Sequence, residues 1–127
     1  MPERGSARRA WVQASLWLAV MITGTSLPGT MLPPLENGLD KVAHFGINAM
    51  LAFLVLRALR RGGATPREVW WVVPAIMAYG ALDELHQLWI PFRDASVNDW
   101  LADSLGAVSG FGCSIYLFKS AWAKWFE

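Results

Sequence analysis

Carboxylate, imidazole and amide side chains gather at the ends of apolar segments in the middle of this chain. One apolar run ends with Asp83, Glu84, His86 and Gln87, and the next run begins with Asp99 and Asp103. A charged group costs about 2.5 to 3.5 kcal/mol at the centre of a membrane helix, and less near its ends. We therefore expect these groups either to be paired with one another or to serve as general acids and bases, metal ligands or ligand-binding groups.

The spacing of the polar residues indicates which of them share a helix face. Asp40, His44 and Asn48 are four residues apart and would line one face of a helix. Together with Glu84 and Asp99, His44 is a candidate general base, which makes these three the catalytic candidates. Metal binding by His44 and carboxylates is the weaker interpretation, because the chain has no His-x-x-x-His pair. We expect no metal and no other cofactor.

The same cluster also has a purely structural interpretation, in which buried polar groups hold short helices in register through hydrogen bonds. A site is favoured because so many titratable groups at one depth exceed what register requires. Arg93 lies in the adjoining loop. It is expected either to pair with Asp94 or Asp99, or to bind a phosphate or carboxylate group of a ligand.

The composition is typical of a helical membrane protein. The chain has 127 residues, enough for one domain, of which 54% are apolar and 8 are Trp. The net charge is +1, and no long basic run or zinc-finger spacing occurs, which argues against nucleic acid as a partner. The single cysteine, Cys113, cannot form an internal disulfide and is expected to be a small apolar filler.

Four apolar runs predict an all-α fold, an integral membrane four-helix bundle. They cover residues 10–27, 42–59, 69–88 and 100–120. The first run would span about 27 Å as a helix, most of a bilayer core, and a signal peptide is its less favoured interpretation. Residues 1–9 are expected to form a mobile basic cytoplasmic tail, and residues 10–122 the transmembrane domain.

The basic residues orient these four predicted spans. With the N-terminus in the cytoplasm, most of them fall on the inner side, namely Arg4, Arg8, Arg9, Arg57, Arg60, Arg61, Arg67, Lys119 and Lys124. The outer side holds Lys41 and Arg93. The positive-inside rule thus favours a multi-pass protein of the cytoplasmic (inner) membrane with both termini cytoplasmic and the polar cluster at the extracytoplasmic face.

The last apolar run carries a stripe of small residues. Ala102, Gly106 and Gly110 recur every four residues, a spacing that lets helices approach closely. The sequence therefore predicts that this helix is the central packing helix and presents Asp99 and Asp103 toward the second and third helices.

Local signals predict where helices begin or bend. Thr65 precedes a proline and has Glu68 three residues later, which is typical of a helix N-terminus. Ser96 and Asp99 have capping-box spacing, with Asp in place of the usual Glu. Pro74 is expected to kink the third helix.

Four short motifs, in this order, resemble the VanZ-like family of small membrane proteins. They are residues 40–45 (DKVAHF), residues 83–87 (DELHQ), residues 91–93 (PFR) followed by Ser96 and Asp99, and residues 103–107 (DSLGA) followed by Gly110. The resemblance covers about residues 40–110 and implies a multi-helix integral membrane protein. The namesake of the family is associated with low-level resistance to the glycopeptide teicoplanin. Two positions depart from the family pattern: position 103, often Asn, is Asp, and position 92, often Gly, is Phe.

The matching motif positions imply a functional set. Besides the three catalytic candidates, it contains the ligand-binding candidates Asp40, Lys41, Gln87, Arg93 and Asp103. We expect the protein to bind or handle a cell-envelope lipid or a lipid-linked cell-wall intermediate, with Lys41 and Arg93 on its anionic head group.

Two alternatives remain open from the sequence. One is a membrane-embedded hydrolase or transferase acting on a lipid head group, in which His44 or Glu84 is the base and Arg93 stabilises negative charge. The other is a non-catalytic membrane assembly partner whose polar cluster is structural.

Overall fold

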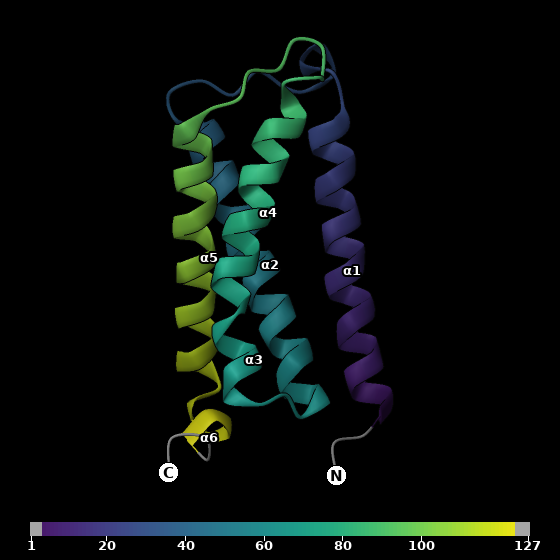
Figure 1. Ribbon diagram of the computed structural model, residues 1–127, viewed down its shortest axis with the longest axis vertical. Coiled ribbons are helices and arrows are strands. Elements are labelled where there is room, and N and C mark those ends of the chain that lie inside the picture. The colour runs from purple at the N-terminus through teal and green to yellow at the C-terminus, as the bar shows by residue number, and fades with distance from the viewer. Residues whose placement is uncertain (1–3, 124–127) are drawn as a thin grey trace.

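The computed structural model describes residues 4–123, and within this range the chain forms helices and loops without any strand. Four long helices run alongside one another (Figure 1): α1 (Arg4–Ser26), α2 (Leu39–Gly62), α4 (Val72–Gln87) and α5 (Val97–Leu117). Shorter segments connect or extend them, namely η1 (Gly29–Met31), α3 (Pro66–Trp70) and α6 (Lys119–Trp122). The predicted all-α fold is confirmed.

The long helices correspond to the predicted apolar runs, with shifted ends. α1 begins at Arg4, ahead of the predicted start at residue 10, so residues 4–9, which were predicted to belong to the tail, are helical. The predicted tail residues 1–3 lie outside the described part. α2 begins at Leu39, which brings Asp40 into its first helical turn, with Lys41 beside it. The predicted ends were placed where the apolar residues stop. The helices extend further, because polar residues continue them beyond the apolar run.

The third predicted helix is divided in two at Trp71. α3 ends at Trp70, and α4 begins at Val72. Pro74, the third residue of α4, has no backbone N–H to donate to the carbonyl four residues earlier, and its ring clashes with that carbonyl. The bend expected at this proline therefore takes the form of a break one turn before it.

α5 packs against both α2 and α4, and its contact with α2 is the most extensive among the described helices. A Cβ atom at Gly106 would overlap the backbone of Phe45, and one at Gly110 would overlap the backbone of Ala49. Only glycine permits this approach, so the predicted close-packing face of the helix is confirmed.

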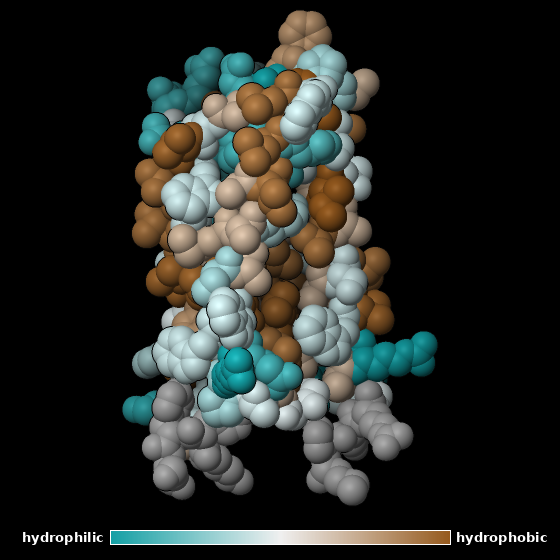
Figure 2. All heavy atoms as spheres, in the orientation of Figure 1, coloured by the Kyte–Doolittle hydropathy of each residue, from teal (hydrophilic) through white to brown (hydrophobic). Residues whose placement is uncertain are grey.

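The core is small, and much of the outer surface is apolar. The buried cluster includes Leu56, Ile76 and Ala107, which come from α2, α4 and α5. Large apolar side chains are exposed along all four long helices, for example Leu16, Met50, Leu82 and Leu105. Figure 2 shows hydrophobic residues over the middle of one face and hydrophilic residues toward its two ends.

Length and composition single out α2 among the described helices as able to cross a membrane. It has 24 residues, and its apolar window has a mean hydropathy of 1.7. α4 is shorter, at 16 residues. α5 has 21 residues, two of which are aspartates. The four predicted spans stay a prediction.

Candidate functional site

The predicted site residues lie at the end of the molecule where α4 ends and α5 begins (top of Figure 1). His44 projects from α2, Glu84 from the last turns of α4, and Asp99 and Asp103 from the first turns of α5. The side chains of His44, Glu84 and Asp103 come within 4.8 Å of one another through their ligand atoms. Three helices thus converge on one cluster, as predicted from the polar residues at the ends of the apolar runs.

His44 bridges the two aspartates of α5. Its Nδ1 atom lies 2.9 Å from Asp103 Oδ1, and its Nε2 atom lies 3.7 Å from Asp99 Oδ2. Asn48, one turn further along α2, donates from its amide nitrogen to the same Asp103 oxygen at 2.7 Å. His44 and Asn48, four residues apart on α2, therefore contact Asp99 and Asp103, four residues apart on α5, and so join one face of each helix.

Lys41 lies on the solvent-exposed side of the cluster. Its ammonium group binds the carboxylates of Asp40 and Asp99 together. The Lys41 side chain is 37% exposed, against 13% for Asp99, so the pair lies between solvent and the buried aspartate. Lys41 thereby fixes the carboxylate that faces His44 Nε2.

Glu84 is held by the start of the next helix. Its Oε2 atom accepts a 2.7 Å hydrogen bond from the backbone N–H of Ser96. The hydroxyl of Ser96 in turn accepts from the backbone N–H of Asp99 at 3.3 Å, so the predicted cap is confirmed. The reciprocal half of the predicted capping box comes from Glu84 on α4, because the Asp99 carboxylate is bound by Lys41 instead.

Gln87 and Arg93 form a second polar group beside the cluster. Gln87, 2% exposed, donates to Asp83 Oδ2 and accepts from Arg93 Nε, both at 3.3 Å. The expected pairing of Arg93 with Asp94 or Asp99 does not occur within residues 4–123. The loop turns at Phe92, whose φ of 59° explains how Arg93 reaches back to Gln87.

Several buried polar atoms at this end have no hydrogen-bond partner in the described part of the chain. They are Glu84 Oε1, Asn48 Oδ1 and the hydroxyl of Tyr79. Buried polar groups are nearly always satisfied, so such atoms call for an explanation. The cluster is also acidic, since four carboxylates (Asp40, Glu84, Asp99 and Asp103) face one lysine and one histidine.

Sequence reasoning missed some of these partners. Asn48 was recognised on the His44 face but not as the residue that holds Asp103; the four-residue spacing was the available signal. The Ser96 backbone amide that binds Glu84 had no signal at all, because backbone donors do not show in a residue pattern. His86 is exposed and lies away from the cluster, as expected from its position off the Glu84–Gln87 face.

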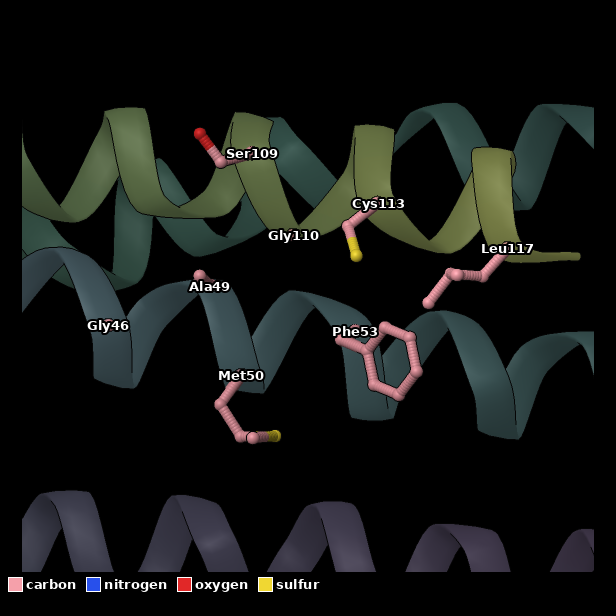
Figure 3. A pocket seen from close by; sticks show the side chains of 8 residues that line it. All are labelled: Gly46, Ala49, Met50, Phe53, Ser109, Gly110, Cys113 and Leu117. Carbon is pink, nitrogen blue, oxygen red and sulfur yellow. The ribbon is translucent and has the colours of Figure 1, made fainter.

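An apolar pocket of about 420 Å³ opens further along α2 and α5 (Figure 3). It is lined by Gly46, Ala49, Met50, Phe53, Ser109, Gly110, Cys113 and Leu117. None of the predicted site residues lines it. The expected apolar filler Cys113 is exposed at this pocket rather than buried.

Comparison with known proteins agrees with the four motifs. The sequence model of the VanZ/LLP1 family matches residues 4–119. No curated protein and no solved structure matches the chain. The family match runs from the start of α1 to the start of α6, including every residue of the polar cluster. This chain belongs to the VanZ/LLP1 family.

Proposed function

We propose that this protein spans the cytoplasmic membrane as a four-helix bundle and binds the anionic head group of an envelope lipid or lipid-linked cell-wall intermediate. The polar cluster would lie at the extracytoplasmic face. The observation that carries the proposal is the position of Arg93 beside the buried acidic cluster, without a carboxylate partner among the described residues.

The hydrogen bond of Arg93 orients its guanidinium group. Because Nε donates to Gln87, the two terminal nitrogens are left to donate elsewhere. A guanidinium presents such nitrogens as a fork that fits the oxygens of a phosphate or carboxylate. Lys41 is already bound by Asp40 and Asp99, so in this proposal it orients the cluster and Arg93 binds the head group.

The surface supports a membrane location. The exposed apolar side chains of the long helices would face lipid, and the hydrophilic ends seen in Figure 2 would face water. The apolar pocket between α2 and α5 lies on the same helices as the cluster, further along both, where an acyl chain would fit. A polar site and an apolar pocket on one helix pair suit an amphiphilic ligand.

An enzyme acting on the same head group is the second candidate function. It is favoured by the pairing of His44 Nδ1 with Asp103 at 2.9 Å, an arrangement in which a carboxylate orients a general base. Arg93 would then stabilise the negative charge that develops on the head group.

Lipid retention in mild detergent tests the binding proposal. We would equilibrate the purified full chain with phosphatidylglycerol, with a polyprenyl phosphate and with uncharged phosphatidylcholine, and measure retained lipid by native mass spectrometry. Arg93→Ala should lower retention of the anionic lipids at least tenfold, with Arg93→Lys in between because it keeps the charge but not the fork. Arg67→Ala, at the opposite end of the helices, is the matched control.

Equal retention by Arg93→Ala and wild type would contradict the proposed function. Release of phosphate or a changed lipid mass during incubation would favour the enzyme instead. Topology is tested separately by fusing a reporter after Glu127, which should report the cytoplasm; an extracytoplasmic signal would overturn the four-span arrangement.

A further inference from the structure

The polar cluster contains the donors of a metal site that the proposed function does not require. One ligand atom each of His44, Glu84 and Asp103 lies within 4.8 Å of the other two, and the three residues come from three different helices. Glu84 and Asp103 are 7% and 2% exposed. Two carboxylates so close together and so deeply buried repel each other unless one of them is protonated or a cation lies between them.

The cationic side chains of the protein supply little positive charge near these two carboxylates. Among residues 4–123, Asp103 has His44 as its ionic partner, and no lysine, arginine or histidine lies within ion-pair distance of Glu84. Lys41 is bound by the two other aspartates. A further positive charge near Glu84 and Asp103 would balance the pair.

A buried carboxylate oxygen of Glu84 without a hydrogen-bond partner in the described part of the chain is a second, independent observation that points to a ligand. Glu84 Oε2 is fixed by the Ser96 amide, which leaves Oε1 buried with no hydrogen-bond partner among the described residues. The amide oxygen of Asn48 is likewise buried and unpartnered, next to the nitrogen that binds Asp103. Glu84 belongs to the group of ligand atoms, and its free oxygen would be satisfied by a cation.

The separation of His44 and Asp103 suits two ligands of one ion. His44 Nδ1 and Asp103 Oδ1 are 2.9 Å apart. Ligands about 2.1 Å from a metal ion, at right or tetrahedral angles, lie about 3.0 to 3.4 Å from each other. A cation could therefore replace the proton between these two atoms with little movement of either helix.

The residues around these donors form the outer contacts that metal ligands need. If Nδ1 of His44 binds the ion, Nε2 carries the proton and faces Asp99 Oδ2 at 3.7 Å, in a carboxylate–histidine–metal arrangement. Lys41 holds that Asp99 carboxylate in place. Asn48 donates to Asp103 at 2.7 Å and fixes its orientation.

We propose that His44, Glu84 and Asp103 bind a first-row divalent cation, Zn²⁺ or Mn²⁺. The imidazole nitrogen among the donors favours these ions over Mg²⁺ and Ca²⁺, which prefer oxygen alone. Three protein ligands leave a coordination position open. The site does not depend on the head-group proposal, because its donors do not include Arg93 or Gln87.

The test measures metal binding to the full chain in detergent, without added lipid. Protein stripped with a chelator and desalted is titrated with Zn²⁺ and with Mn²⁺ by calorimetry, and bound metal is counted by elemental analysis. We expect one equivalent per chain. Glu84→Gln and Asp103→Asn should each weaken binding at least tenfold, whereas Asp94→Asn, in the exposed loop, should bind as wild type does.

A spectroscopic measurement on wild type covers the case in which a variant fails to fold. Co²⁺ at the site should give visible bands of a nitrogen–oxygen ligand set, and Zn²⁺ should displace it. Well-folded wild type that shows no saturable binding, or variants that bind as tightly as wild type, would overturn the metal site. Anionic lipid retained by metal-free protein would leave the head-group proposal standing, and metal bound without lipid retention would leave only the metal site.

Discussion

His44 on α2 contacts Asp103 on α5 at 2.9 Å, across 59 positions of sequence. The residue that follows His44, Phe45, is the one whose backbone lies against Gly106, three residues after Asp103. Close backbone packing and the polar contact thus occupy neighbouring turns of the same two helices. The glycine face brings the helices together, and the polar side chains join them just above it.

Gly106→Ala should destabilise the protein by about 1 to 3 kcal/mol, because its Cβ atom would overlap the Phe45 backbone and force α2 and α5 apart. The matched control is Gly112→Ala on the same helix, where no atom lies within 4 Å of the added Cβ. That change should be neutral or stabilising by up to about 1 kcal/mol. Thermal unfolding in detergent compares them; equal effects would contradict the close approach.

Asn48 and Asp103 should show a measurable coupling in a double-mutant cycle of Asn48→Ala and Asp103→Ala. Their hydrogen bond is 2.7 Å long and buried. If the helices span a membrane as proposed, hydrogen bonds between them average about 0.6 kcal/mol and reach about 1.7 kcal/mol, and we expect a value in the upper half of that range. Unfolding of the four proteins gives the coupling. A value of zero would mean that the contact adds nothing to stability.

Two substitutions at Glu84 separate its charge from its hydrogen bond. Glu84→Gln keeps an oxygen that can accept from the Ser96 N–H, so folded yield and stability should stay close to wild type. Glu84→Leu leaves that N–H without its acceptor and should cost about 1 to 3 kcal/mol. Yield in the membrane and thermal unfolding measure both. If Glu84→Gln already lowers the folded yield sharply, the cluster is mainly structural.

Helices and their polar faces could be predicted because they follow from spacing within one segment. The four-residue repeats placed His44 and Asn48 on one face of α2, and Gly106 and Gly110 on the packing face of α5. Topology then brought the polar ends of three helices to one level. These features depend on local periodicity and on the number of helices alone.

The partners of individual groups could not be predicted in the same way. Arg93 binds Gln87 rather than a nearby aspartate because the loop reverses at Phe92, and Glu84 binds the Ser96 amide because that loop carries the start of α5 to the end of α4. Loop geometry and backbone donors decide both contacts, and neither leaves a pattern in the sequence.

The start of α3 should respond to acid through Glu68. The backbone N–H and hydroxyl of Thr65 donate to its carboxylate at 2.6 and 2.8 Å, which lowers the pKa of Glu68 below its ordinary value of 4.5. A lowered pKa means that this contact stabilises the fold above pH 4.5 and is lost as the pH falls through the folded value. Carbon-13 NMR of labelled Glu68 should give the lowered pKa. In Glu68→Gln, the Thr65 amide signal should no longer change with pH in this range.

The Phe92→Gly variant should be more stable than the Phe92→Ala variant. Its φ of 59° lies in the left-handed region, which costs a residue with a Cβ atom about 1 to 2 kcal/mol, and its side chain is 80% exposed. The loop is held in this shape by contact with η1: Gly29 N–H donates to the Pro91 carbonyl at 3.0 Å, and a Cβ at Gly29 would overlap the Phe92 carbonyl. Both Phe92→Gly and Phe92→Ala remove the aromatic ring. Phe92→Gly also removes the backbone strain, whereas Phe92→Ala keeps that strain.

The difference between these two variants therefore isolates the backbone conformation from any contact of the ring with lipid or detergent. We expect Phe92→Gly to exceed Phe92→Ala by about 1 kcal/mol in free energy of unfolding, with both variants retaining anionic lipid as long as Arg93 still reaches Gln87. Thermal unfolding in the same detergent gives the difference. Equal stability of the two variants would mean that residue 92 does not hold the left-handed conformation, and that the loop reaches Gln87 by another path.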